Sequence, residues 1–465
     1  MAVSPDDLDD IQGLLKSGYG PLGEAAYLLL RIRDPGAARA WLRAFRPTTV
    51  GDLNQKVARA RHVAFTASGL AALGLPAAVL EGFSPEFVGG MADDPARSRR
   101  LGDVGANAPA GWAWGRGADE PHLLVMLFAA GDDLAALKSE VQNADFATAF
   151  DVRELSTAPL DGREPFGFVD GLSQPEIDWA GERTPGTSED LDYGNRIAAG
   201  EFVLGHPNEY GLVTRTPGIG ADGRDGSLGR NGSYLVFRQL AQDVEGFWTF
   251  VNARGGLPLA EAMVGRRRDG QALAEPARRT IRGVGPKQAD ITFNNYDFES
   301  DVDGTTCPVS GHVRRANPRT GDQPGGDLGP IRKLAGMLGV GLERRADTVA
   351  SSRFHRLLRR GRKYVSSEGT GLHFITLGAS IARQFEFVQG AWLASAKFGG
   401  LSGEQDPLLG SRQPFPEGHA TDGFRWPQKD GPCAAFEGLP QFVTVRGGAY
   451  FFLPGLAALR RLAEL

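Results

Sequence analysis

Three short segments carry side chains whose types could do chemistry together. The segment CPVSGHVRRANPR places His312 among arginines, and a neutral imidazole is a common metal ligand. In EPFGFVDGLSQP, Asp170 stands between apolar residues and Gly171, where a buried carboxylate costs free energy unless it is hydrogen-bonded or functional. In FHRLLRRGRKYV, Arg359 and Arg360 could each supply a fixed positive charge. Together these segments can provide a ligand, an acid–base group and a cation.

Each segment also has a simpler structural interpretation, which is favoured when it is taken alone. A lone histidine is most often a residue with satisfied hydrogen bonds, and Asp170-Gly171 is a common turn pair. The LLRRG segment is typical of a basic helix end stabilised by the helix dipole. In combination, however, the three segments match the parts of a haem peroxidase site.

Composition excludes several classes of protein. The chain has 465 residues, 41% of them hydrophobic, which is enough for large cores and indicates two or three domains. A net charge of −5 points neither to nucleic acid nor to an anionic membrane surface. Two cysteines are too few for a disulfide scaffold. The acidic N-terminus lacks an apolar run, and no segment is long enough to cross a membrane, so we expect a cytoplasmic protein.

The elements that must position these residues follow a repeated strand–helix pattern. Residues 25–32 read as a strand, and the next segment places Ala38, Trp41, Leu42 and Phe45 on one helical face. The same succession recurs at 61–74, 122–142, 232–252, 371–393 and 447–459. The pattern predicts an α+β fold with an antiparallel sheet. Because it occurs in both halves, we expect two similar domains, 1–225 and 226–465.

The sequence resembles the dye-decolorizing peroxidases. GFVDG is similar to the family's G-x-x-D-G motif, CPVSGHVRRANPR to its proximal-histidine motif and LLRRG to its distal-arginine segment. GLHFIT, RQFEFVQ and GGAYFFLPG also look like family segments, so the resemblance runs from the early strands to the C-terminus. It implies two ferredoxin-like domains, each an antiparallel β-sheet with peripheral helices, and haem bound mainly in the C-terminal domain.

The resemblance also assigns residues to the cofactor. It implies that His312 is the proximal haem ligand and that Arg319, in Asn-Pro-Arg, binds a propionate. The second imidazole nitrogen needs an acceptor, and Glu386 is a candidate, although it could equally face solvent. Arg314 and Arg315 either assist with the propionates or face water.

On the other face of the haem, Asp170 would be the distal acid–base and Arg359 would stabilise negative charge and lower the pKa of Asp170. Leu372 and Phe374 would wall the distal pocket, since their alternation places both on one face of a strand. A carboxylate remains a base where imidazole is already protonated, so we expect activity at mildly acidic pH.

The implied function is a haem b peroxidase that reduces hydrogen peroxide and oxidises dyes, phenolics or other aromatic donors by one-electron steps. An alternative is a haem carrier or iron-releasing protein with incidental peroxidase activity, and a third is a haem-free ferredoxin-like binding module. No nucleic-acid or membrane partner is expected, and both a monomer and a homo-oligomer are compatible with the sequence.

Overall fold

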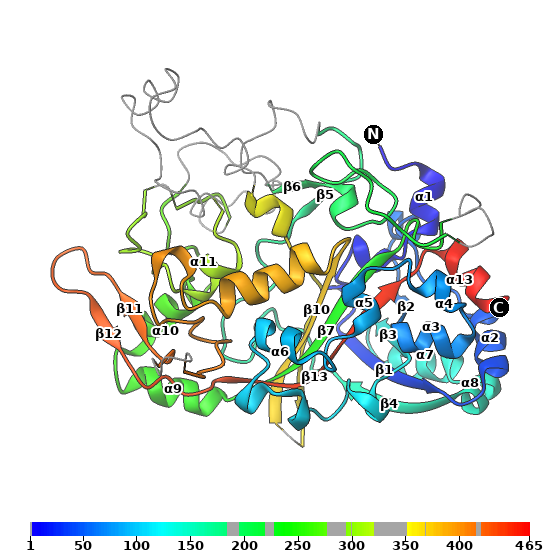
Figure 1. Cartoon of the computed structure of the whole chain (residues 1–465), viewed down its shortest axis with the longest axis horizontal. Coiled ribbons are helices and arrows are strands. Elements are labelled where there is room, and N and C mark those ends of the chain that lie inside the picture. The colour runs from blue at the N-terminus through cyan, green and yellow to red at the C-terminus, as the bar shows by residue number, and fades with distance from the viewer. Residues whose placement is uncertain are drawn as a thin grey trace.

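The structure, a computed structural model, describes residues 2–183, 195–218, 227–276, 294–298, 300–319, 351–367, 369–414 and 420–465. Within them, the dominant feature is one nine-stranded sheet whose neighbouring strands are antiparallel (Figure 1). In spatial order the strands are β4 (Phe150–Ser156), β1 (Glu24–Ile32), β3 (Leu123–Ala129), β2 (Arg59–Phe65), β13 (Val443–Leu453), β7 (Ser233–Gln242), β10 (Gly369–Gly378) and β8 (Leu358–Arg359), and β9 (Arg362–Ser366) also pairs with β10. The antiparallel sheet with helices confirms the predicted α+β class.

Two short two-stranded sheets lie apart from the main one. β5 (Glu176–Asp178) pairs in parallel with β6 (Arg196–Ala198), and β11 (Phe424–Trp426) pairs antiparallel with β12 (Ala434–Phe436). The β11–β12 hairpin projects from the left-hand edge of the molecule in Figure 1.

Strand composition explains why both faces of the large sheet are covered. Every residue of β3 is buried, and the neighbouring β1 is buried along most of its length. Alternate side chains enter two separate hydrophobic clusters, for example Leu28 and Val125 in one and Tyr27 and Leu124 in the other. The sheet is therefore an inner layer, and helices must cover it.

Short helices supply that cover. They are α1 (Pro5–Asp10), α2 (Pro35–Ala44), α3 (Ala67–Leu73), α4 (Ala77–Leu80), α5 (Pro85–Gly89), α6 (Pro95–Leu101), α7 (Asp133–Val141), α8 (Ala144–Ala149), α9 (Val244–Asn252), α10 (Gly256–Val264), α11 (His312–Ala316) and α13 (Leu456–Ala463). In α2, Asp34 caps the first turn by accepting from the N–H of Ala37, and the predicted apolar face is buried. None of the described helices is both long and apolar enough to cross a membrane.

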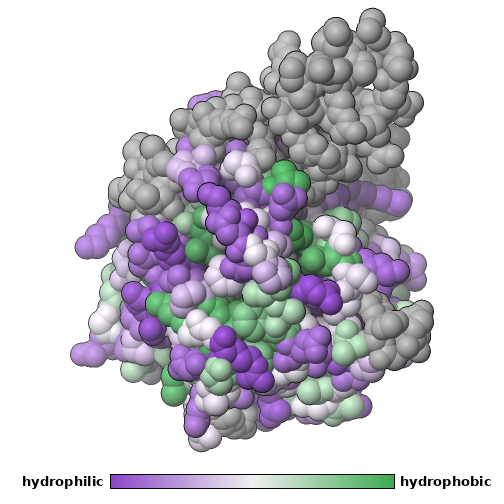
Figure 2. Space-filling model, turned by 90° about the vertical axis from the view of Figure 1, so that its left-hand side faces the viewer, coloured by the Kyte–Doolittle hydropathy of each residue, from purple (hydrophilic) through white to green (hydrophobic). Residues whose placement is uncertain are grey.

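Most helices of the two halves lie in different parts of the molecule, although the C-terminal helix α13 lies on the right beside α2 (Figure 1). Most of α2–α8 lie on the right in Figure 1, whereas α9, α10 and α11 lie on the left. Figure 2 views that left-hand side, where apolar residues gather near the centre of the face and hydrophilic residues surround them. The C-terminal strand β13 lies between β2 and β7 and so joins strands from before and after residue 225. The division into domains 1–225 and 226–465 stays a proposal.

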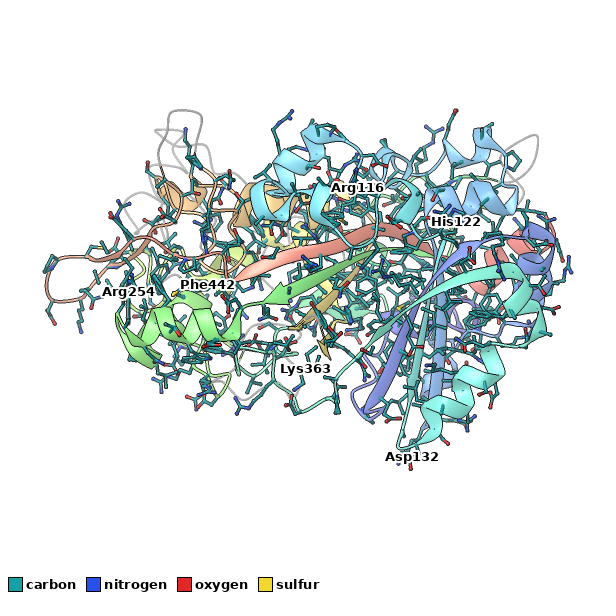
Figure 3. The ribbon with its side chains drawn as sticks, turned by 90° about the horizontal axis from the view of Figure 1, so that it is seen from below. Arg116, His122, Asp132, Arg254, Lys363 and Phe442 are labelled. Atoms are coloured by element: carbon teal, nitrogen blue, oxygen red, sulfur yellow. The ribbon has the colours of Figure 1, made fainter. Side chains whose placement is uncertain are left out.

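The predicted strand–helix successions are found, with one difference in helix type. β10 is followed by two π-helical segments, η8 (Ala382–Glu386) and η9 (Val388–Leu393), rather than by a regular α-helix. Figure 3 shows how β13 starts beside α9: Phe442, just before the strand, packs edge-on against Phe247 of that helix with ring centroids 5.4 Å apart. Wide turns of the π type are common near functional sites, and this one borders the cavity described next.

Candidate active site

A cavity of about 240 Å³ lies against one face of the sheet, where the strands β7, β10 and β13 line it. The sheet contributes an apolar wall, and α11 and the π-helical segments form other parts of the lining. His312, Asp170 and Arg359 all line this cavity. Three residues that stand far apart in the sequence are therefore brought to one place.

Strand register builds the apolar wall. Leu372 of β10 lies opposite Leu240 of β7, which in turn lies opposite Val445 of β13, and all three line the cavity. Phe374 also lines it, whereas His373 between them is buried on the other face of β10. The structure thus places Leu372 and Phe374 on the cavity wall, as strand alternation predicts.

His312 is the first residue of the short helix α11, and a carboxylate fixes its ring. Its Nδ1 donates to Oδ2 of Asp406 at 2.9 Å, so Nε2 is the nitrogen left for a metal. Asp406 is fully buried, and its Oδ1 accepts from the N–H groups of Leu408 and Leu409. Burial raises the pKa of Asp406, but His312, Arg315 and the N–H of Leu409 outweigh burial and hold that pKa below its usual value.

The prediction that Glu386 accepts the hydrogen bond from His312 is wrong. Glu386 lies in the π-helical segment η8, and its Oε1 accepts a hydrogen bond from the Tyr450 hydroxyl at 2.9 Å and forms an ion pair with Arg97, whose Nε lies 2.9 Å away. Arg100 pairs with its other oxygen at 3.6 Å. The alternative of a solvent-facing side chain is also wrong, since only 10% of it is exposed. Glu386 is not the acceptor for His312 because Arg97, Arg100 and Tyr450 already neutralise and position its carboxylate.

Asp170 lies on the cavity lining but is exposed, contrary to the expected burial. Its backbone N–H donates to the carbonyl of Gly162, and its Oδ1 accepts from the N–H of Gly171 at 2.6 Å. The loop needs glycine on both sides, because Gly167 and Gly171 adopt φ values of +94° and +80°. The exposed carboxylate can therefore contact a ligand in the cavity directly.

The two neighbouring arginines face different surroundings. Arg359 lines the cavity and its Nη2 donates to the carbonyl of Leu172 at 2.7 Å. Arg360 points away, donating to the carbonyls of Leu14 and Leu15 in the N-terminal half. Among the ion pairs of the described residues, none joins Arg359 to Asp170. Of the two neighbours, the geometry therefore supports Arg359 rather than Arg360 as a cation of the cavity.

Arg319 is buried beside the cavity and is not among the described residues that line it. Its guanidinium donates to the carbonyls of Asn294 and Tyr296 and to the hydroxyl of Ser173. Arg266, which the sequence analysis missed, does line the cavity, and its Nη2 donates to the same hydroxyl at 2.7 Å. No spacing in the run GRRRD distinguishes Arg266 from its neighbours.

Arg314 and Arg315 do not face water. Arg314 pairs with Asp301 at 3.1 Å and lies over the ring of Phe298. Arg315 is fully buried and donates to four backbone carbonyls, among them that of Trp392 in η9. Both side chains thus tie α11 to neighbouring segments.

Two further carboxylates line the cavity and were not anticipated. Asp103 forms a buried ion pair with Arg238 of β7. Burial raises the pKa of Asp103, although the charge of Arg238 opposes the increase. Glu164 lies in the same loop as Asp170. Glu164 opens the segment EPFGFVDGLSQP, but only Asp170 of that segment is predicted to be functional, and Asp103 belongs to none of the three segments.

Known proteins resemble the chain along nearly its full length. A curated relative, the multifunctional dye peroxidase DyP2 of Amycolatopsis sp., is 30% identical over 423 residues, covering 86% of this chain and 81% of the relative. The dye-decolorizing peroxidase msp1 of Mycetinis scorodonius is 26% identical and covers 99% of this chain and 88% of the relative. A solved fungal DyP-type peroxidase from Auricularia auricula-judae superposes with a TM-score of 0.74 at 25% identity, covering 99% of this chain and all of that one. No protein-family model matches.

Proposed function

Because the chain belongs to the dye-decolorizing peroxidase family and is a haem-dependent peroxidase with the α+β ferredoxin-like fold, we propose that it uses hydrogen peroxide to oxidise dyes, phenolics or other aromatic donors by one-electron steps. The single observation that carries the proposal is the cavity that His312, Asp170 and Arg359 line together. An imidazole, a carboxylate and a cation in an apolar cavity are the groups that this reaction requires.

The lining fits haem b. Nε2 of His312 would bond the iron, and Asp406 would keep the imidazole oriented and electron-rich. Leucine, valine and phenylalanine side chains would contact the porphyrin plane. Arg266 and, behind it, Arg319 would balance the charge of the propionates at the Ser173 side of the cavity. When bound, the haem would supply the electrons that reduce peroxide, and the aromatic donors would then replace those electrons.

The protein side chains would handle the proton and the charge. Asp170 takes the proton from one peroxide oxygen and returns it to the other as the bond between them breaks. Arg359 stabilises the negative charge that develops on the departing oxygen. Leu372 and Phe374, which line the cavity, would narrow the space so that peroxide enters and bulky donors do not. Such donors would deliver their electrons from the protein surface.

The test is the substitution Asp170→Asn in the haem-loaded protein. The amide cannot carry the proton, so the reaction with peroxide should slow by about 10²–10⁴-fold, while the Soret band shows that haem binding is kept. Asp119→Asn, at an exposed site, is the matched control and should react as the wild type does. A variant Asp170→Asn that reacts normally would contradict the catalytic scheme and favour a haem carrier.

A further inference from the structure

Glu164 lies in the segment EPFGFVDG that leads to Asp170, and both residues line the cavity. The Glu164 carboxylate is half-buried and accepts three hydrogen bonds. Its Oε1 accepts from the N–H of Phe168 and its Oε2 from the N–H of Phe166, each at 2.9 Å. Oε2 also accepts from Nε2 of Gln242 at 3.0 Å.

The backbone of this segment closes into a tight turn around the carboxylate. The N–H of Glu164 donates to the carbonyl of Phe168, and the N–H of Gly167 donates back to the carbonyl of Glu164. Gly167 sits in the left-handed region, which closes the turn. Because Asp170 follows directly, the position of the turn sets where its side chain enters the cavity.

The turn is held between a helix and the sheet. Phe166 packs on Phe247 of α9 with ring centroids 4.5 Å apart, and its carbonyl accepts from the Trp248 indole. On the other side, Gln242 is the last residue of β7 and pairs with Val443 of β13. The Glu164–Gln242 hydrogen bond thus connects the turn to the strands that form the cavity wall.

The electrostatic surroundings explain how a carboxylate is tolerated here. Burial raises the pKa of Glu164, while the N–H groups of Phe166 and Phe168 and the amide of Gln242 oppose the increase. The negative charge of Asp170 raises the pKa further. Both acidic groups line the cavity, where Asp170 is exposed and Glu164 is half-buried.

We propose that Glu164, anchored to β7 by Gln242, is the positioning residue that holds Asp170 in place at the cavity. The proposal rests on the proposed peroxidase function, in which Asp170 carries the proton. Glu164 itself does not touch peroxide in this scheme and acts through the turn.

Glutamine at position 164 would test the proposal because it keeps the volume and removes one acceptor. A carboxylate offers two acceptor oxygens to the two backbone N–H groups, whereas an amide offers one oxygen and turns its own donor toward the second N–H. One hydrogen bond of the turn must therefore be lost in Glu164→Gln. The milder variant Gln242→Leu removes the connection to β7 and keeps the carboxylate of Glu164 with its two backbone hydrogen bonds.

The first measurement is hydrogen–deuterium exchange of the full chain, which does not depend on peroxidase activity. We expect the peptide that spans 164–170 to exchange about tenfold faster in Glu164→Gln and by a smaller factor in Gln242→Leu. The exposed control Glu437→Gln should exchange as the wild type does. Unchanged exchange in both test variants would overturn the proposal.

The second measurement is the rate of change of the Soret band after the haem-loaded protein is mixed with hydrogen peroxide. Glu164→Gln should slow this step at least tenfold while leaving haem binding unchanged. In an Asp170→Asn background, Glu164→Gln should cause no further slowing, because it acts through Asp170.

The outcomes separate this proposal from the proposed function. Equal slowing by Glu164→Gln in both backgrounds would overturn the positioning role, since it would show an effect independent of Asp170. If Asp170→Asn reacted at the wild-type rate, the catalytic scheme would be refuted instead. Faster hydrogen exchange of residues 164–170 in Glu164→Gln would still show that Glu164 stabilises the turn.

Discussion

At the scale of single residues, the imidazole of His312 and the carboxylate of Asp406 act as a pair. The bond between Nδ1 and Oδ2 fixes the ring and leaves Nε2 directed for coordination. Because Asp406 is fully buried and also held by two backbone N–H groups, it cannot turn away from the ring. A negative partner makes the imidazole a stronger electron donor to a bound metal.

The substitution Asp406→Asn should weaken that donation, because the amide is neutral. We expect haem affinity or the peroxide reaction to fall by about 10–100-fold and the reduction potential of the bound iron to rise. Haem titration at the Soret band and spectroelectrochemistry measure these changes, and the exposed Asp430→Asn is the control. An unchanged potential would mean that Asp406 does not tune the imidazole.

At the scale of elements, β10 decides which side chains face the cavity. It lies between β7 on one side and β8 and β9 on the other, so its register is fixed from both edges. This register directs Leu372 and Phe374 to the cavity and His373 to the opposite core. The close approach of β10 to β7 also explains why residue 371 is a glycine, since a Cβ at Gly371 would lie 1.9 Å from the carbonyl oxygen of Leu240.

Gly371→Ala should therefore destabilise the fold, because neither backbone can move without breaking strand pairing. We expect a loss of about 1–3 kcal/mol or more in the free energy of unfolding, as for other overpacked sites. Gly20→Ala is a matched control, because no atom lies within 4 Å of its Cβ position. Denaturant unfolding measures the free energy of unfolding of both variants. Equal unfolding midpoints would contradict the close approach of β10 to β7 at Gly371.

At the scale of the whole molecule, the buried His62 and His373 and the half-buried His355 link stability to pH. Burial lowers the pKa of His62 to about 3 and those of His355 and His373 to about 4. The unfolded chain binds these protons near pH 6.5, but in the folded chain His355 and His373 do not bind them until the pH falls to about 4, and His62 until about 3. The stability that neutral histidine provides is therefore present above pH 6.5 and is lost as the pH falls toward 4.

His373→Gln should isolate this effect, since Nε2 of His373 donates to the carbonyl of Ser156 and glutamine keeps a donor. Between pH 7 and pH 4, the wild type should lose on the order of 3 kcal/mol more stability than the variant. Denaturant unfolding at several pH values measures the difference. If the free energies of unfolding of the wild type and the variant differed by the same amount at every pH in this range, His373 would not be held neutral in the folded protein.

Sequence alone determined the six strand–helix successions and three of the cavity's groups, because these depend on local patterns, whereas LLRRG, which taken alone resembles a helix end, contains strand β8. The apolar runs at β1 and β3 and the alternation at β10 are read within a few residues. His312, Asp170 and Arg359 were found because each stands in a short segment of unusual composition. The assignment of Arg359 over Arg360 rested on the motif, and strand geometry then supplied a reason.

Only the tertiary structure decided which distant groups meet. Asp406, rather than Glu386, accepts from His312 because packing places a buried carboxylate from a separate segment against the ring. Arg266 reaches the cavity and Arg319 lies behind it, although both are arginines beside the same hydroxyl. Hydrogen-bond partners and exposure depend on how the chain packs in three dimensions, and residue type and local spacing do not encode them.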